Sequence, residues 1–107
     1  MNNRLEILRQ FVAEEPQDPF NHYALATELL KFDKTESRHI FEFLVKNYSE
    51  YLATYYHLAA LYVEMGEQHF AEKTYLEGIA LAHKIGNEKT LKELKGAYQM
   101  FLDELDD

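Results

Sequence analysis

The stretch from residue 55 to residue 78, YYHLAALYVEMGEQHFAEKTYLEG, decides the fold. Its first half places Tyr55, Leu58 and Tyr62 at spacings of three and four residues, which is the period of one face of an α-helix. Gly66 follows this helix, and glycine adopts the left-handed geometry that ends a helix at little cost. The stretch therefore predicts two helices joined by a tight turn.

The same pattern occurs earlier in the chain. A shift of 33 residues moves the core positions of the first half (Tyr55, Leu58, Ala59 and Tyr62) onto His22, Leu25, Ala26 and Leu29. A shift of 34 residues moves the positions Ala71, Tyr75 and Gly78 of the second half onto Ser37, Phe41 and Leu44. A further shift of 33 residues leads to Arg4, Leu8 and Phe11, where Arg4 is the poorest match. A repeat of this length is typical of stacked helix pairs.

Residues at the expected helix ends agree with this pattern. Asp18 followed by Pro19 predicts an N-cap and a first helical residue. Asp33 with Glu36 three residues later predicts a start of the capping-box type. Ser49 is expected to cap the helix that follows it.

Gly86 predicts a second helix stop, and Asn87 predicts the cap of the next helix. These signals predict helices over residues 3–14, 19–32, 35–47, 51–65, 68–84 and 88–105.

Composition narrows the possible functions. The chain has 107 residues, 47% of them hydrophobic, which suffices for one compact domain. It has no cysteine, which excludes disulfides and thiol chemistry. Its formal charge of −8 disfavours binding to nucleic acid, whose phosphates attract basic surfaces. With no apolar run long enough for a signal peptide or a membrane span, a soluble cytoplasmic protein is expected.

No residue pattern points to catalysis. The five histidines do not pair at the spacings of three or four that a metal site on one helix needs: His22, His39, His57, His69 and His83. The glycines form no phosphate-binding loop, and no serine lies in a nucleophile elbow. We therefore predict a protein without enzyme activity, metal or cofactor.

Eight positions of residues 52–86 resemble the signature of a tetratricopeptide repeat: Tyr55, Leu58, Ala59, Tyr62, Gly66, Ala71, Tyr75 and Gly78. The resemblance implies an all-α fold in which antiparallel helix hairpins stack into a right-handed superhelix. It divides a single domain, 1–107, into a half repeat, a first repeat, a second repeat and a capping helix, namely 3–18, 19–51, 52–86 and 87–105. The first repeat matches less well, since Asp33 stands where glycine is common.

The resemblance also implies a function, because the first helix of each such repeat lines a concave groove that binds a peptide or protein partner. It places in that groove Phe20, Tyr23, Thr27, Lys31, Ala53, Tyr56, Ala60 and Glu64. Tyr23 and Tyr56 are favoured as contacts, because tyrosine combines wide apolar area with a hydroxyl. The alternative is that both only pack against neighbouring helices. The groove lacks the Lys and Asn pairs of modules that clamp the C-terminal carboxylate of chaperones, so that activity is not expected.

The last predicted helix allows a second hypothesis. Its apolar stripe is formed by Leu91, Leu94, Tyr98, either Phe101 or Leu102, and Leu105. Such a helix caps the end of a repeat array, or it pairs with a second copy. The alternative function is therefore a homo-oligomeric assembly protein, with a homodimer formed through a terminal helix.

Overall fold

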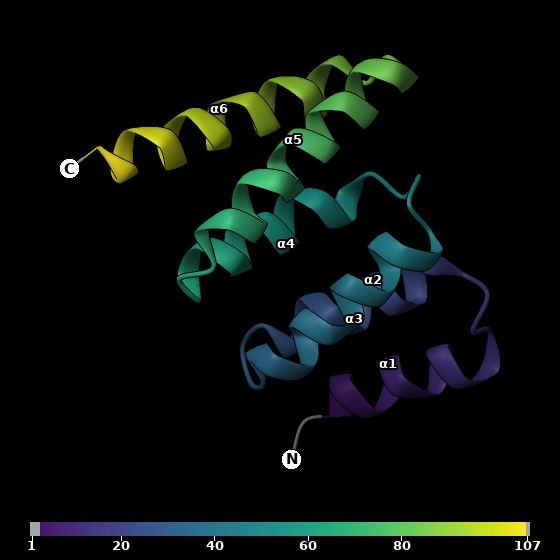
Figure 1. Cartoon of the computed structure of the whole chain (residues 1–107). Helices are drawn as coiled ribbons and strands as arrows, with labels where there is room; N and C mark the ends of the chain where they lie inside the picture. The colour runs from purple at the N-terminus through teal and green to yellow at the C-terminus, as the bar shows by residue number, and fades with distance from the viewer. Residues whose placement is uncertain (1–2, 107) are drawn as a thin grey trace. The chain divides into compact units, whose positions relative to one another are not determined.

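The computed structural model describes residues 3–106, which contain six α-helices and no strand (Figure 1). The helices are α1 (Asn3–Glu14), α2 (Pro19–Leu29), α3 (Lys34–Asn47), α4 (Ala53–Glu64), α5 (Gln68–Ile85) and α6 (Glu88–Leu105). The predicted all-α class is confirmed. Within the described residues, no helix is both long and apolar enough to span a membrane.

The chain forms two compact units, Met1–Thr54 and Tyr55–Asp107. The boundary falls at the start of α4, so the first unit holds α1, α2 and α3 and the second holds most of α4 with α5 and α6. The predicted division into a half repeat, two repeats and a capping helix stays a prediction.

In the first unit, α2 and α3 form an antiparallel hairpin. The ring of His22 lies 5.0 Å from that of Phe43, and the buried Ser37 hydroxyl donates to the carbonyl of Ala26 at 2.7 Å. From His22 to Ala26 on α2, the contacting residue on α3 moves back from Phe43 to Ser37, so the two helices run in opposite directions. The apolar core of the pair is formed by Leu25, Ala26, Leu29, Phe41 and Leu44.

Helix α1 runs antiparallel to α2, and polar contacts connect the two helices. Arg4 Nε lies 3.1 Å from Glu28 Oε1, and Asn21 Nδ2 donates to the carbonyl of Phe11 at 3.3 Å. None of the α1 residues is buried. The first unit is therefore built around the α2–α3 hairpin, with α1 on its surface.

In the second unit, α5 packs between α4 and α6. The rings of Tyr62 and Phe70 lie 5.5 Å apart near the α4–α5 turn, and Gly78 lies against Tyr55 at the far end of α4. These pairs show that α4 and α5 run antiparallel. The small positions Ala59 and Ala71 are completely buried, as expected for helices in close contact.

Helices α5 and α6 form the second antiparallel pair of this unit. The Tyr98 hydroxyl donates to Glu72 Oε2 at 3.0 Å, and Leu94 lies against Gly78. The core residues of the second unit include Leu58, Leu61, Tyr62, Tyr75, Ala82, Leu94 and Phe101.

Most of the predicted helix ends are confirmed. The side chain of Asp18 accepts from the backbone N–H of Phe20 at 3.0 Å, and that of Asn87 accepts from Thr90 N–H at 3.0 Å. Two glycines at helix ends have the expected left-handed geometry, with φ 77° at Gly66 and 75° at Gly86.

The start of α3 forms half of the predicted capping box. The Asp33 side chain accepts from the backbone N–H of Glu36 at 3.0 Å. The Glu36 carboxylate does not reach back to the cap; it accepts two hydrogen bonds from the Arg9 guanidinium, at 2.7 and 2.9 Å. This residue therefore connects α3 to α1.

Two predicted helix boundaries differ from the structure by more than one residue. Helix α4 begins at Ala53, so Ser49 lies outside its N-cap position. Helix α2 ends at Leu29 instead of Phe32. The N–H groups that follow it, those of Leu30, Lys31 and Phe32, bond to carbonyls three residues back and tighten the last turn.

Candidate functional site

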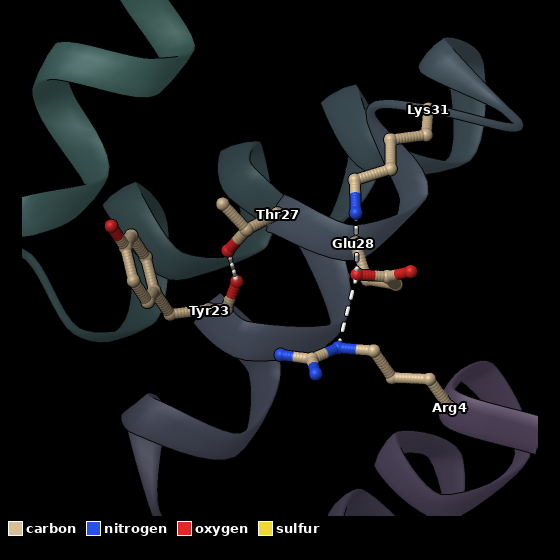
Figure 2. Close-up of polar contacts among 5 residues, drawn as sticks. All are labelled: Arg4, Tyr23, Thr27, Glu28 and Lys31. Atoms are coloured by element: carbon tan, nitrogen blue, oxygen red, sulfur yellow. Dashed lines mark hydrogen bonds and ion pairs between the residues drawn. The ribbon is translucent and has the colours of Figure 1, made fainter.

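The α2 residues of the predicted groove differ strongly in exposure. Phe20 is 56% exposed at the start of the helix. Tyr23 is half-buried, with its ring 6.3 Å from that of Phe41 and 5.6 Å from that of Tyr51. Thr27 is half-buried as well, and its hydroxyl donates to the carbonyl of Tyr23 (Figure 2). Of the two tyrosines favoured by the sequence, Tyr23 is thus largely a packing residue.

Lys31, the one cation of the predicted groove, is engaged within its own unit. Its Nζ lies 3.3 Å from Glu28 Oε1, and Arg4 Nε lies 3.1 Å from the same oxygen (Figure 2). Glu28 is only 8% exposed, so the two cations compensate a buried carboxylate. Lys31 therefore contributes to the structure of the first unit rather than offering an uncompensated charge.

The ion pairs of Glu28 with Arg4 and Lys31 were not predicted from the sequence. Glu28 follows Leu25 by three residues and precedes Leu29 by one, so an acid interrupts the apolar face of α2. That interruption is a detectable signal of a compensated charge, but it does not identify the compensating residue.

Burial affects the phenol groups of two first-unit tyrosines, Tyr23 and Tyr51. It raises the pKa of Tyr23, and it raises that of Tyr51, with smaller contributions from Tyr23 and Asp18. Tyrosine already titrates near pH 10, so both phenols remain neutral at physiological pH. They can donate hydrogen bonds there but carry no negative charge.

The α4 residues of the predicted groove are mostly exposed. Ala53 is half-buried, Ala60 and Glu64 are exposed, and Tyr56 is 41% exposed. Tyr56 is the groove residue of α4 that borders a hollow. It is therefore the more accessible of the two tyrosines that the sequence favoured.

A hollow of about 180 Å³ lies in the second unit, and we call it the second-unit hollow. Helix α4 contributes Tyr56 and Val63, and α5 contributes Tyr75. Helix α6 contributes the remaining lining residues, Ala97, Met100, Phe101 and Glu104. Tyr75 and Phe101 are buried, and Met100 is 65% exposed, so the hollow has a buried floor and an accessible rim.

The α6 part of the hollow was not predicted, because the apolar stripe of this helix indicated capping or dimerisation. Residues 97, 100, 101 and 104 are spaced by three, one and three, which places them on one helix face. The signal was therefore present, but Glu104 interrupts the apolar pattern that was sought.

A larger hollow, of about 430 Å³, lies in the first unit. It is lined by Pro19 and by the residues that connect α3 to α4, namely Asn47, Tyr48, Ser49, Glu50 and Tyr51. None of the predicted groove residues lines it.

Five of the eight predicted groove residues belong to the first unit and three, Tyr56, Ala60 and Glu64, to the second. The structure brings together Tyr23 and Thr27 within the first unit. The groove as one continuous surface stays a prediction. Across residues 3–106, no three His, Asp or Glu side chains gather as metal ligands would.

Comparisons with known proteins agree with the helical repeat. No protein-family model matches the chain, and no curated protein matches it. Solved structures do match. The solution NMR structure of a tetratricopeptide repeat domain protein from Salinibacter ruber is 41% identical, with a TM-score of 0.76, over 80% of this chain and 88% of that one. A crystal structure of a tetratricopeptide repeat domain protein from the same organism gives 41% identity and a TM-score of 0.75, over 78% and 96% of the two chains.

The identity, the coverage and the shared helical fold support one conclusion. The chain belongs to the tetratricopeptide repeat family.

Proposed function

We propose that this chain is a non-catalytic module that binds a peptide or protein partner through exposed aromatic side chains on α2 and α4. Membership of the tetratricopeptide repeat family supports protein interaction in general. The sequence assigned both helices to the binding surface, and each carries an exposed aromatic residue, Phe20 and Tyr56.

The observation that carries the proposal is Tyr56 at the rim of the second-unit hollow. An exposed tyrosine beside buried aromatic residues offers a partner a large apolar contact with little loss of side-chain entropy. A partner side chain that enters the hollow removes apolar surface from water, which favours binding.

Tyr23 has a supporting role in this proposal. Its contacts with Phe41 and Tyr51 hold the start of α2 against the rest of the first unit. A Tyr23→Ala variant would disturb packing as well as binding, so it is a poor probe. Phe20 is the better target in the first unit because it is exposed.

The test begins with selection of binding peptides from a displayed random library against the full chain. Affinities are then measured by fluorescence anisotropy for the wild type, Phe20→Ala and Tyr56→Ala. We expect at least one of the two variants to weaken binding by about tenfold or more, as aromatic interface residues do.

Matched controls come from exposed apolar residues outside the predicted groove. Phe32 is 59% exposed and Leu76 is 47% exposed, and their alanine variants should bind as the wild type does. Equal affinity of Phe20→Ala, Tyr56→Ala and the wild type, with unchanged melting temperatures, would refute the proposal.

A second candidate function is homo-oligomeric assembly through a terminal helix. Ile7 and Phe11 of α1 are 50% and 48% exposed and lie four residues apart, on one face of the helix. An exposed apolar pair of this kind favours contact with a second copy. Light scattering should then show a dimer at high micromolar concentration that Ile7→Ser with Phe11→Ser converts to a monomer. A monomeric wild type under these conditions rules this candidate out.

A further inference from the structure

The size of the second-unit hollow restricts what it can hold. Its volume of about 180 Å³ is below the roughly 300–1,000 Å³ of pockets that enclose small-molecule ligands or cofactors. The hollow is also open at its rim, where Tyr56 and Met100 are exposed. A single side chain that projects from a larger partner fits these dimensions better than a free small molecule does.

The lining combines aromatic rings with one charge. Tyr56, Tyr75 and Phe101 supply rings from three helices, and the rings of Tyr75 and Phe101 lie 6.0 Å apart. Met100 adds an adaptable apolar side chain. Glu104 is the one charged residue among those that line the hollow. An occupant must therefore satisfy apolar walls and a carboxylate together.

The electrostatic environment of Glu104 favours a cation. Glu104 lies in the last turn of α6, where the helix dipole places partial negative charge and where no basic residue compensates it. From Gly96 to Asp106 the chain carries three acids and no Lys or Arg. Among the described residues, no side chain forms an ion pair with Glu104 within 4.0 Å.

We propose that the second-unit hollow binds the arginine side chain of a basic peptide segment. The proposal rests on the proposed function and names the class of peptide that the module binds. Charge complementarity supports it on two scales: Glu104 is part of the hollow, and the chain has a formal charge of −8.

Arginine matches the lining better than leucine or an acidic side chain does. Its methylene stem can lie along Val63 and Met100, its planar guanidinium stacks on aromatic rings, and its paired N–H groups suit a carboxylate. A leucine would leave Glu104 without a partner as water is displaced. An acidic side chain would be repelled.

The experiment follows the Met100 methyl group by NMR in full-length protein labelled at methionine methyls. Short blocked peptides that differ at one central position, arginine, citrulline or leucine, are titrated in turn. Citrulline has the shape of arginine without its charge. Met65 is exposed but does not line the hollow, so its methyl group reports contact elsewhere.

We expect the arginine peptide to shift the Met100 signal, with a smaller effect at Met65 and weaker binding at higher salt. Glu104→Gln should raise the dissociation constant by about threefold to fivefold, as expected for an accessible ion pair. The matched control is Glu93→Gln, because Glu93 is an exposed acid on α6 outside the hollow, and it should leave the dissociation constant unchanged. Tyr56→Ala should weaken binding further, because it removes one wall.

Equal shifts with the citrulline or leucine peptide would overturn the proposal, since the hollow would then recognise shape or apolar area without charge. The arginine peptide could leave the Met100 signal unshifted while library-selected peptides still bind and depend on Phe20 or Tyr56. That result would overturn the arginine proposal and leave the proposed function standing. Absence of peptide binding in both the library selection and the NMR titration would overturn the arginine proposal and the proposed function together.

Discussion

Replacing Gly78 by alanine tests the close packing of the second unit. A Cβ atom at this position would lie 2.7 Å from Tyr55 Cβ, 3.3 Å from Tyr55 Cγ and 3.2 Å from Leu94 Cδ1. Tyr55 Cβ is bonded to the backbone, so rotation of the side chain cannot move it away. Both neighbours are buried, at 5% and 0% exposure, which leaves little room for adjustment. Helix α5 must therefore shift away from α4.

The magnitude follows from two opposing effects. Overpacking of a buried contact costs about 1–3 kcal/mol. Alanine in a helix interior is favoured over glycine by about 0.8–1.0 kcal/mol. Gly78→Ala should therefore lower the free energy of unfolding by about 1 kcal/mol, or the melting temperature by roughly 4–8 °C for a domain of this size.

Gly96→Ala is the matched control, because a Cβ there meets no atom within 4 Å. This variant gains helix propensity without overpacking, so it should be stabilised by about 0.8–1.0 kcal/mol. The difference between the two variants isolates the packing cost of about 1–3 kcal/mol, since the propensity gain cancels. Urea denaturation followed by far-ultraviolet circular dichroism measures both. Stabilisation of Gly78→Ala to the same extent as Gly96→Ala would refute the reasoning.

Three further predictions concern the remaining packing and charge contacts. Hydrogen bonds from Arg9 lower the pKa of Glu36, so the stability they contribute is present above the unfolded pKa of about 4.3 and is lost as pH falls through the lower folded pKa. Arg9→Ala should therefore lower the free energy of unfolding by about 0.2–1 kcal/mol at pH 7, because the pair is accessible, and should have no effect in strong acid. Denaturation at both pH values measures this difference. Burial lowers the pKa of His57, so its NMR titration midpoint should lie below about 6.5. The free energy of unfolding should decrease below about pH 6.5, where the imidazole is protonated in the unfolded chain before it is protonated in the folded protein. A midpoint at or above about 6.5 contradicts this prediction. Ala59→Leu should destabilise the protein by about 1–3 kcal/mol because Ala59 is completely buried, whereas Ala60→Leu at an exposed position should have little effect. Equal melting temperatures of the two variants would contradict the close packing at Ala59.

The helices could be predicted from sequence because their determinants are local. Asp18, Asp33 and Asn87 cap backbone groups two or three residues away, and Gly66 and Gly86 adopt the left-handed geometry that glycine allows. The end of α2 was harder to predict, because Leu30 and Phe32 continue the apolar pattern after the helix has stopped.

The candidate site was less predictable because it depends on contacts between helices. Tyr23 and Tyr56 occupy equivalent places 33 residues apart, yet Tyr23 packs on Tyr51 and Phe41 while Tyr56 is exposed at a hollow. Glu104 contributes to that hollow from a helix that the repeat pattern did not assign to binding. Sequence periodicity gives the face of a helix on which a residue lies, but not what lies opposite.

The attachment of α1 has a consequence for the order in which the first unit opens. A helix of 12 residues is marginal by itself in water. None of the α1 residues is buried, and Arg4 and Arg9 join it to Glu28 and Glu36 through ion pairs whose arginines are well exposed. The accessible Arg9–Glu36 pair weakens as added ions shorten the Debye length, whereas the pair at the buried Glu28 is screened less. The amide protons of α1 should therefore exchange with solvent faster than those of α2 and α3, and this difference should widen with ionic strength. We therefore expect α1, whose Leu5, Leu8 and Val12 are only half-buried, to open at a lower free energy than the α2–α3 hairpin.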